Sequence, residues 1–86
     1  MPTFYDLYGT MGNTYTKQEQ KYLQQVGQNI RDARQLIGLS QEKFAVVCKL
    51  DRTYISDVER GERNLSLLNL RKIAKALKVP LSQIVE

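Results

Sequence analysis

Apolar residues recur with helical spacing along most of the chain, and nothing in it reads as a strand. From Leu23 to Ile37, five apolar residues follow one another at steps of three or four, which places them on one face of a helix. The segment TKQE, which begins at Thr16, matches a capping box, and Gly38 can end the helix in the left-handed conformation. We therefore expect a first helix over about residues 17–37.

Four shorter helices are expected in the rest of the chain. Ser40, Asp51 and Ser66 each offer a side-chain oxygen to the backbone N–H groups of a following helical turn, and Gly61 and Pro80 interrupt the helical pattern. The fourth helix is expected to bury an apolar face of Leu67, Leu70, Ile73, Ala74 and Leu77. The expected helices cover residues 41–48, 52–60, 67–78 and 81–85, and the predicted fold class is all-α.

The second and third of these helices are short and are joined by a tight turn, which is typical of a helix-turn-helix. Ala45 lies where the two helices would cross, so it must be small. Phe44 and Cys48 can anchor the second helix, and Ile55 and Val58 can anchor the third. The third helix then has a thin apolar stripe and a crowded polar face.

Three segments carry a family resemblance: LSQEKFA, LDRTYISDVERGERN and LLNLRKIAKALKVPL. They resemble the Cro/phage-repressor (XRE) type of DNA-binding domain, and within it the controller proteins of restriction–modification systems are most similar. The resemblance covers about residues 26–85 and implies a five-helix, lambda-repressor-like domain. We divide the chain into an N-terminal arm with the start of an extended first helix (1–24) and the helix-turn-helix domain (25–86).

The resemblance implies that the third helix lies in the major groove of DNA. The residues expected to read bases are Arg52, Thr53, Tyr54, Ser56 and Asp57. A guanidinium such as that of Arg52 can bond both O6 and N7 of guanine. Asp57 can accept a hydrogen bond from cytosine, or it can orient Arg52 or Arg60. Tyr54 can meet a phosphate or the central bases, or its ring can pack half-buried on the second helix.

The residues expected to contact phosphates are Gln41, Lys43, Arg60, Arg63 and Asn64. For Lys43, a solvated surface charge is the favoured alternative. Arg34 and Glu59 are expected, from the resemblance, to form a structural salt bridge between the first and third helices. One position departs from the family pattern, because Lys49 stands where a glycine is common. The turn there needs a positive φ, which costs a non-glycine residue roughly 1 kcal/mol.

Composition narrows the function classes. The 86 residues include one cysteine and no histidine, so we expect no disulfide framework, no metal site, no cofactor and no enzymatic activity. The net charge of +4 lies entirely in residues 25–86, which favours a polyanionic partner. No apolar run is long enough to cross a membrane, and the first residues do not resemble a signal peptide, so the expected location is the cytoplasm.

One helix touches only a few base pairs, so we expect a homodimer that binds a palindromic double-stranded DNA operator. The candidate interface residues are Leu65, Leu68, Leu81, Ile84 and Val85; for Leu81 and Ile84, membership of the core is at least as good an interpretation. The predicted function is a sequence-specific transcription regulator, with a restriction–modification controller as the finer hypothesis. An antitoxin-like protein-binding module is the alternative, and no small-molecule effector is evident.

Overall fold

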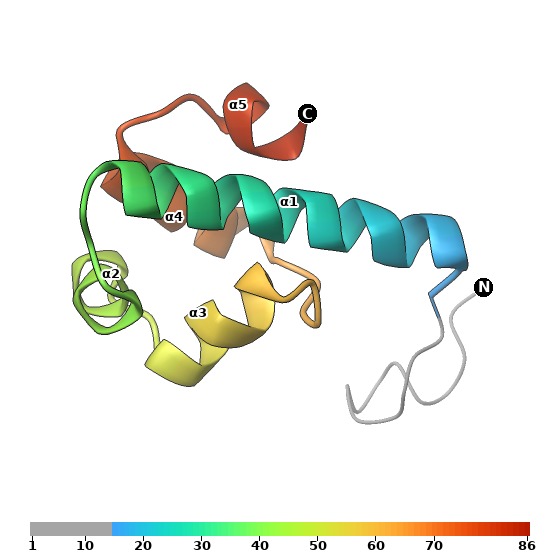
Figure 1. The fold of residues 1–86 in the computed structure, drawn as a ribbon, viewed down its shortest axis with the longest axis horizontal. Helices are drawn as coiled ribbons and strands as arrows, with labels where there is room; N and C mark the ends of the chain where they lie inside the picture. Colours follow the sequence, from blue (N-terminus) through green and yellow to red (C-terminus); the bar gives the residue numbers. More distant parts are fainter. Residues whose placement is uncertain (1–14) are drawn as a thin grey trace.

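The computed structural model describes residues 15–86 and contains only helices over that range (Figure 1). Their bounds are α1 Lys17–Leu36, α2 Gln41–Cys48, α3 Arg52–Glu59, α4 Leu67–Leu77 and α5 Leu81–Val85. Each helix begins at its predicted first residue, and each ends at its predicted last residue or one residue earlier. The all-α class and the five-helix order are therefore confirmed. No helix of the described residues is both long enough and apolar enough to cross a membrane.

Helix α1 packs against α3, α4 and α5, whereas α2 packs on α3 and α4. In Figure 1, α3 lies on one side of α1 and α5 on the opposite side, with α4 behind. The capping box forms as expected: the Thr16 hydroxyl accepts the Glu19 N–H at 3.0 Å, and the Glu19 carboxylate accepts the Thr16 N–H at 2.9 Å. The helix continues unbroken through residue 24, and the Tyr22 hydroxyl donates to the Val85 carbonyl at the end of α5. Residues 1–14 of the expected N-terminal arm lie outside the described part.

The core is aliphatic, with one phenylalanine at its centre. Every helix contributes to it, and its most deeply buried side chains are Phe44, Ile30, Ile55, Ile73, Ile84 and Val58. Ile84 is only 1% exposed, so its assignment to a dimer interface is wrong. The short helix α5 packs on both α1 and α4, and a large side chain at Ile84 closes that end of a small core.

Two apolar positions predicted for the inner faces are exposed instead. Leu67 is 72% exposed at the first turn of α4, and Ile37 is 45% exposed just beyond the end of α1. In both cases the apolar repeat extends about one turn past the part of the helix that other elements cover. Helical periodicity predicts a face, but the lengths of the neighbouring helices decide how much of that face is buried.

The connections place α3 relative to the rest of the domain. Ser40, Asp51 and Ser66 all cap the helices that they precede, with side-chain oxygens 2.8–3.1 Å from backbone nitrogens. Lys49 adopts φ 59° and ψ 42°, which is the left-handed conformation. The turn between α2 and α3 therefore keeps the geometry that glycine usually provides, and the side chain at this position is a lysine.

Candidate nucleic-acid interface

Helix α3 has one face inside the domain and one face outside it. Ile55 and Val58 are 0% and 2% exposed and hold the helix on α1 and α2. The side chains of Arg52 and Thr53, at the first turn, are exposed. The polar face that the sequence indicated is therefore open at the first turn of α3, and Ser56 and Asp57 farther along it are partly exposed.

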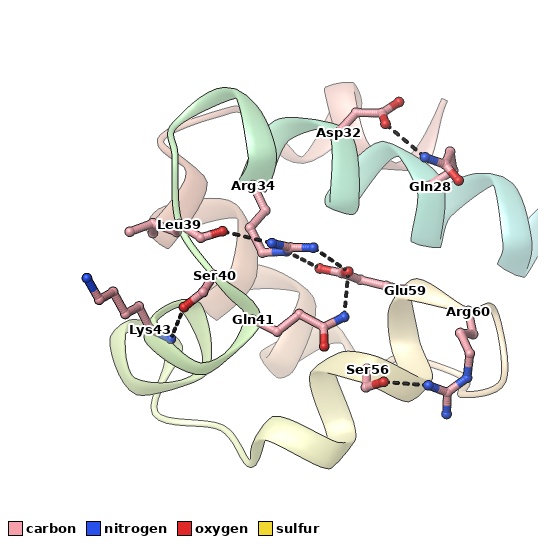
Figure 2. Close-up of polar contacts among 10 residues, drawn as sticks. All are labelled: Gln28, Asp32, Arg34, Leu39, Ser40, Gln41, Lys43, Ser56, Glu59 and Arg60. Atoms are coloured by element: carbon pink, nitrogen blue, oxygen red, sulfur yellow. Dashed lines mark hydrogen bonds and ion pairs between the residues drawn. The ribbon is translucent and has the colours of Figure 1, made fainter.

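The inner side of α3 also carries a buried ion pair. Arg34 of α1 donates to both carboxylate oxygens of Glu59, at 2.7 and 3.0 Å, and to the Leu39 carbonyl at 2.7 Å. The Gln41 amide donates to the same carboxylate at 2.9 Å, so α1, α2 and α3 meet at Glu59 (Figure 2). The pairing of Arg34 with Glu59 that the resemblance implied is formed. A bidentate guanidinium–carboxylate contact fixes direction as well as distance.

The first turn of α3 is held by its cap, and its first two side chains, those of Arg52 and Thr53, are exposed. Asp51 accepts the Thr53 N–H at 2.8 Å, as the sequence predicted. Within residues 15–86, the Arg52 guanidinium makes no hydrogen bond or ion pair. An exposed arginine on a capped, anchored helix end has the chemistry and the reach to bond the edge of a guanine.

A second group of charged residues covers the outer side of α3. The Asp57 carboxylate lies 2.6 Å from an Arg60 nitrogen and 3.5 Å from the Arg63 Nε. Arg60 also donates to Ser56 (Figure 2), and at 3.2 Å it donates to Glu62. The hydrogen bond to Glu62, with the charges of Glu62 and Asp57, raises the pKa of Arg60. Asp57 was expected to orient either Arg52 or Arg60, and in the structure it contacts Arg60.

Tyr54 lies at the border between the core and the outer side of α3. Its hydroxyl accepts a hydrogen bond from the Asn69 amide of α4 at 3.1 Å, and the Arg63 guanidinium lies 5.1 Å from the ring centroid. The Tyr54 ring is half-buried, as the alternative interpretation has it, but the hydrogen bond of its hydroxyl is to α4. Sequence reasoning missed Asn69, because nothing in its position beyond the Ser66 cap distinguishes it.

The remaining phosphate candidates differ in how far they are already engaged. Gln41 is partly buried, and its amide donates to Glu59; a second N–H of that amide group remains. Lys43 and Asn64 are exposed, and Figure 2 shows the Lys43 side chain pointing away from the domain. The structure thus places Gln41 both in the buried network and at the N-terminus of α2.

The candidate dimer residues do not form a uniform set. Leu68 is 70% exposed and Leu81 is 37% exposed, whereas Leu65 and Val85 are partly buried against the core. Leu67, which sequence reasoning assigned to the core, is also strongly exposed beside Leu68. Among these candidates, the most exposed apolar side chains therefore lie at the start of α4; Leu36 and Val46, at 88% and 76%, are exposed elsewhere on the described surface.

We next consider the metal-binding and nucleophilic side chains of the described residues. No group of three potential metal-binding side chains occurs within residues 15–86. Cys48 is buried in the core, and this burial raises the pKa of its thiol to about 11. The thiol is therefore protonated at neutral pH, and Cys48 packs as a small apolar residue.

Comparisons with known proteins agree with this geometry. The helix-turn-helix family model matches residues 30–84. The control protein C.BamHI of Bacillus amyloliquefaciens is 57% identical over 54 residues, which cover 62% of this chain and 67% of that protein. The crystal structure of the restriction–modification controller C.AhdI of Aeromonas hydrophila has a TM-score of 0.71 at 45% identity and covers 72% of this chain and 94% of that one.

A third relative was solved with DNA. The structure of C.Esp1396I bound to a 25 base pair operator site has a TM-score of 0.64 at 36% identity, and the match covers 76% of this chain and 96% of that one. The family match, the five-helix fold and the capped α2–turn–α3 unit all agree. The chain therefore belongs to the XRE-type helix-turn-helix family of DNA-binding regulators, and it resembles the controller proteins of restriction–modification systems.

Proposed function

We propose that this protein is a dimeric, sequence-specific transcription regulator that controls restriction–modification genes. The observation that carries the proposal is the anchored helix α3, whose first turn presents Arg52 and Thr53 outward while Ile55, Val58 and Glu59 are buried. A helix that is fixed on one side and polar on the other suits the major groove. The function is binding rather than catalysis, and it is exercised in the cytoplasm, where the DNA is.

The residues have distinct roles in this proposal. Arg52 bonds O6 and N7 of a guanine, and Thr53 contacts a thymine methyl or a neighbouring base edge. Tyr54, Ser56 and Asp57 line the same face. Phosphates are met by the second N–H of Gln41 with the N-terminus of α2 behind it, and by the cationic and amide side chains of Lys43, Arg60, Arg63 and Asn64.

A dimer is proposed because one copy of α3 reaches too few base pairs to be selective. Two copies related by a two-fold axis read half-sites about 34 Å apart on one face of the duplex. The relative C.Esp1396I was solved bound to an operator site of 25 base pairs, a length that supports a site with two such contacts. The proposed contact residues are the exposed pair Leu67 and Leu68, together with Leu65, Leu81 and Val85.

Selection of bound sequences from a pool of random duplexes at about 0.15 M salt tests this function. The expected product is a palindromic sequence with half-site centres 10–11 base pairs apart, bound at least about 10³-fold more tightly than a scrambled duplex. Sedimentation of the complex should give two chains per duplex. A protein that shows no preference among duplexes would refute the regulator and leave a protein-binding role as the better explanation.

A further inference from the structure

Asp57 lies beneath two arginines that the proposed function directs to DNA phosphates. One carboxylate oxygen contacts Arg60 at 2.6 Å and the other contacts Arg63 at 3.5 Å. The Asp57 side chain is 21% exposed, while those of Arg60 and Arg63 are 52% and 49% exposed. The carboxylate is therefore the inner member of the group, and the guanidinium groups are the outer members.

Each arginine has further contacts that define its direction. Arg60 donates to Ser56 and to Glu62 as well as to Asp57. Arg63 stands over the ring of Tyr54, and the hydroxyl of that tyrosine is held by Asn69 of α4. The outer side of α3 thus carries arginines that are already oriented before any DNA arrives, which lowers the entropic cost of using them.

The charges of this group cancel. Two guanidinium groups, of Arg60 and Arg63, face two carboxylates, of Asp57 and Glu62. A phosphate that approaches must compete with Asp57 for both arginines, on any duplex. Only a duplex with the right bases adds the contacts of Arg52 that offset this competition.

We infer that Asp57 is a specificity-determining positioning residue, which aims Arg60 and Arg63 and weakens their attraction for duplexes of the wrong sequence. This inference rests on the proposed function. It differs from a role in reading cytosine, in which Asp57 would bond a base directly and its removal would relax the preference at that base pair alone.

The test compares Asp57→Asn with Glu42→Gln in the full chain. Glu42 is an exposed carboxylate in the first turn of α2 and has no hydrogen bond or ion pair within the described residues, so it controls for the lost negative charge. Binding to the selected operator and to a scrambled duplex is measured between about 0.05 and 0.3 M salt. Asp57→Asn should bind the scrambled duplex about three- to tenfold more tightly than wild type, with the salt slope steeper by about 1–2.

The operator affinity should change less, so the ratio of operator to scrambled affinity should fall for Asp57→Asn and stay constant for Glu42→Gln. In an Arg60→Gln, Arg63→Gln background, Asp57→Asn should have no further effect, because its action passes through those arginines.

An unchanged ratio of operator to scrambled affinity in Asp57→Asn would overturn the inference. The inference would also be overturned if Asp57→Asn lost affinity only for the operator and showed a relaxed preference at one C·G pair. That result would identify Asp57 as a residue that reads a base. A wild-type chain without any selectivity refutes the proposed function itself, and the role of Asp57 with it.

Discussion

Helix α3 carries a guanidinium–carboxylate group on each of its two sides, and the two groups differ in their access to water. On the inner side, the side chains of Arg34 and Glu59 are 8% and 2% exposed. On the outer side, Asp57 is 21% exposed and its two arginines are about half exposed. The chemistry is the same, but only the inner group is removed from solvent.

This difference separates structural charges from charges available for binding. The inner group has its remaining polar atoms satisfied by the Leu39 carbonyl and the Gln41 amide, and no buried side-chain nitrogen or oxygen of the described residues lacks a partner. Losing one member would leave a buried charge uncompensated. The outer group exchanges readily with water and phosphate, because exposed ion pairs are individually weak.

Breaking the inner pair should have the largest effect. Arg34→Ala leaves the Glu59 carboxylate buried without its bidentate partner, and this should lower the free energy of unfolding by about 3–5 kcal/mol. Thermal and urea denaturation followed by circular dichroism measure the loss. The sequence preference of the folded fraction should change less than the stability, since Arg34 is remote from the exposed face of α3.

A paired replacement sharpens that test. Arg34→Met with Glu59→Leu removes both charges and keeps apolar volume, so the double variant should lose much less stability than Arg34→Ala. A thermal melt of Arg34→Ala indistinguishable from wild type would show that the buried pair does not hold α3 in place.

Gly27 probes the inner side of α3 without changing any charge. A Cβ at Gly27 would lie 2.4 Å from the Val58 carbonyl oxygen and 2.7 Å from that of Glu59. Gly27→Ala should therefore push α3 away from α1 and destabilise the protein by about 1–3 kcal/mol, although alanine favours a helix more than glycine does. Gly38→Ala is no control, because Gly38 has a positive φ; Gln28→Ala, one residue along α1, is the matched surface variant and should alter the melting temperature little.

Lys49 tests the turn that joins α2 to α3. Lys49→Gly should stabilise the protein by roughly 0.5–1 kcal/mol, because glycine removes the left-handed strain but costs more chain entropy. Lys78 has nearly the same φ, 61°, at the end of α4, so Lys78→Gly should give a similar gain. A change of DNA sequence preference in Lys49→Gly but not in Lys78→Gly would mean that the lysine turn sets the pitch of α3.

The outer group, Asp57 with Arg60 and Arg63, should matter least for stability. Asp57→Asn should shift the melting temperature by less than about 5 °C, since the carboxylate and its arginines are open to solvent. A loss as large as that of Arg34→Ala would erase the distinction between the two sides of α3.

The sequence predicted the helices well because their signals are local. The caps at Ser40, Asp51 and Ser66 and the apolar steps in α1 depend on neighbours within a few residues. The inner ion pair followed from the family resemblance and is formed as expected. Predicting the helices needed no knowledge of how they pack, whereas the ion pair joins residues 25 positions apart and was expected only because the family resemblance implied it.

What the sequence did not predict depends on distant contacts. The sequence left open whether Ile84 is buried and did not predict that Leu67 is exposed; both follow from how far α5 and the neighbouring helices extend. The lack of a side chain at Gly27 permits the close approach of α3 to α1, and a glycine inside a helical pattern does not by itself indicate such a contact. The hydrogen bond between Asn69 and Tyr54 joins residues 15 positions apart, and neither residue type predicts it.

The most direct test of the account compares Arg52→Ala with Arg63→Ala on the selected operator and on variants that replace each base pair in turn. Arg52→Ala should lose discrimination at one G·C pair of each half-site, by about 1–3 kcal/mol, and keep its preferences elsewhere. Arg63→Ala should weaken binding to all the duplexes about equally and reduce the salt slope by about 1. If Arg52→Ala keeps every base preference of the wild type, α3 does not read DNA through its first turn, and the central claim is wrong.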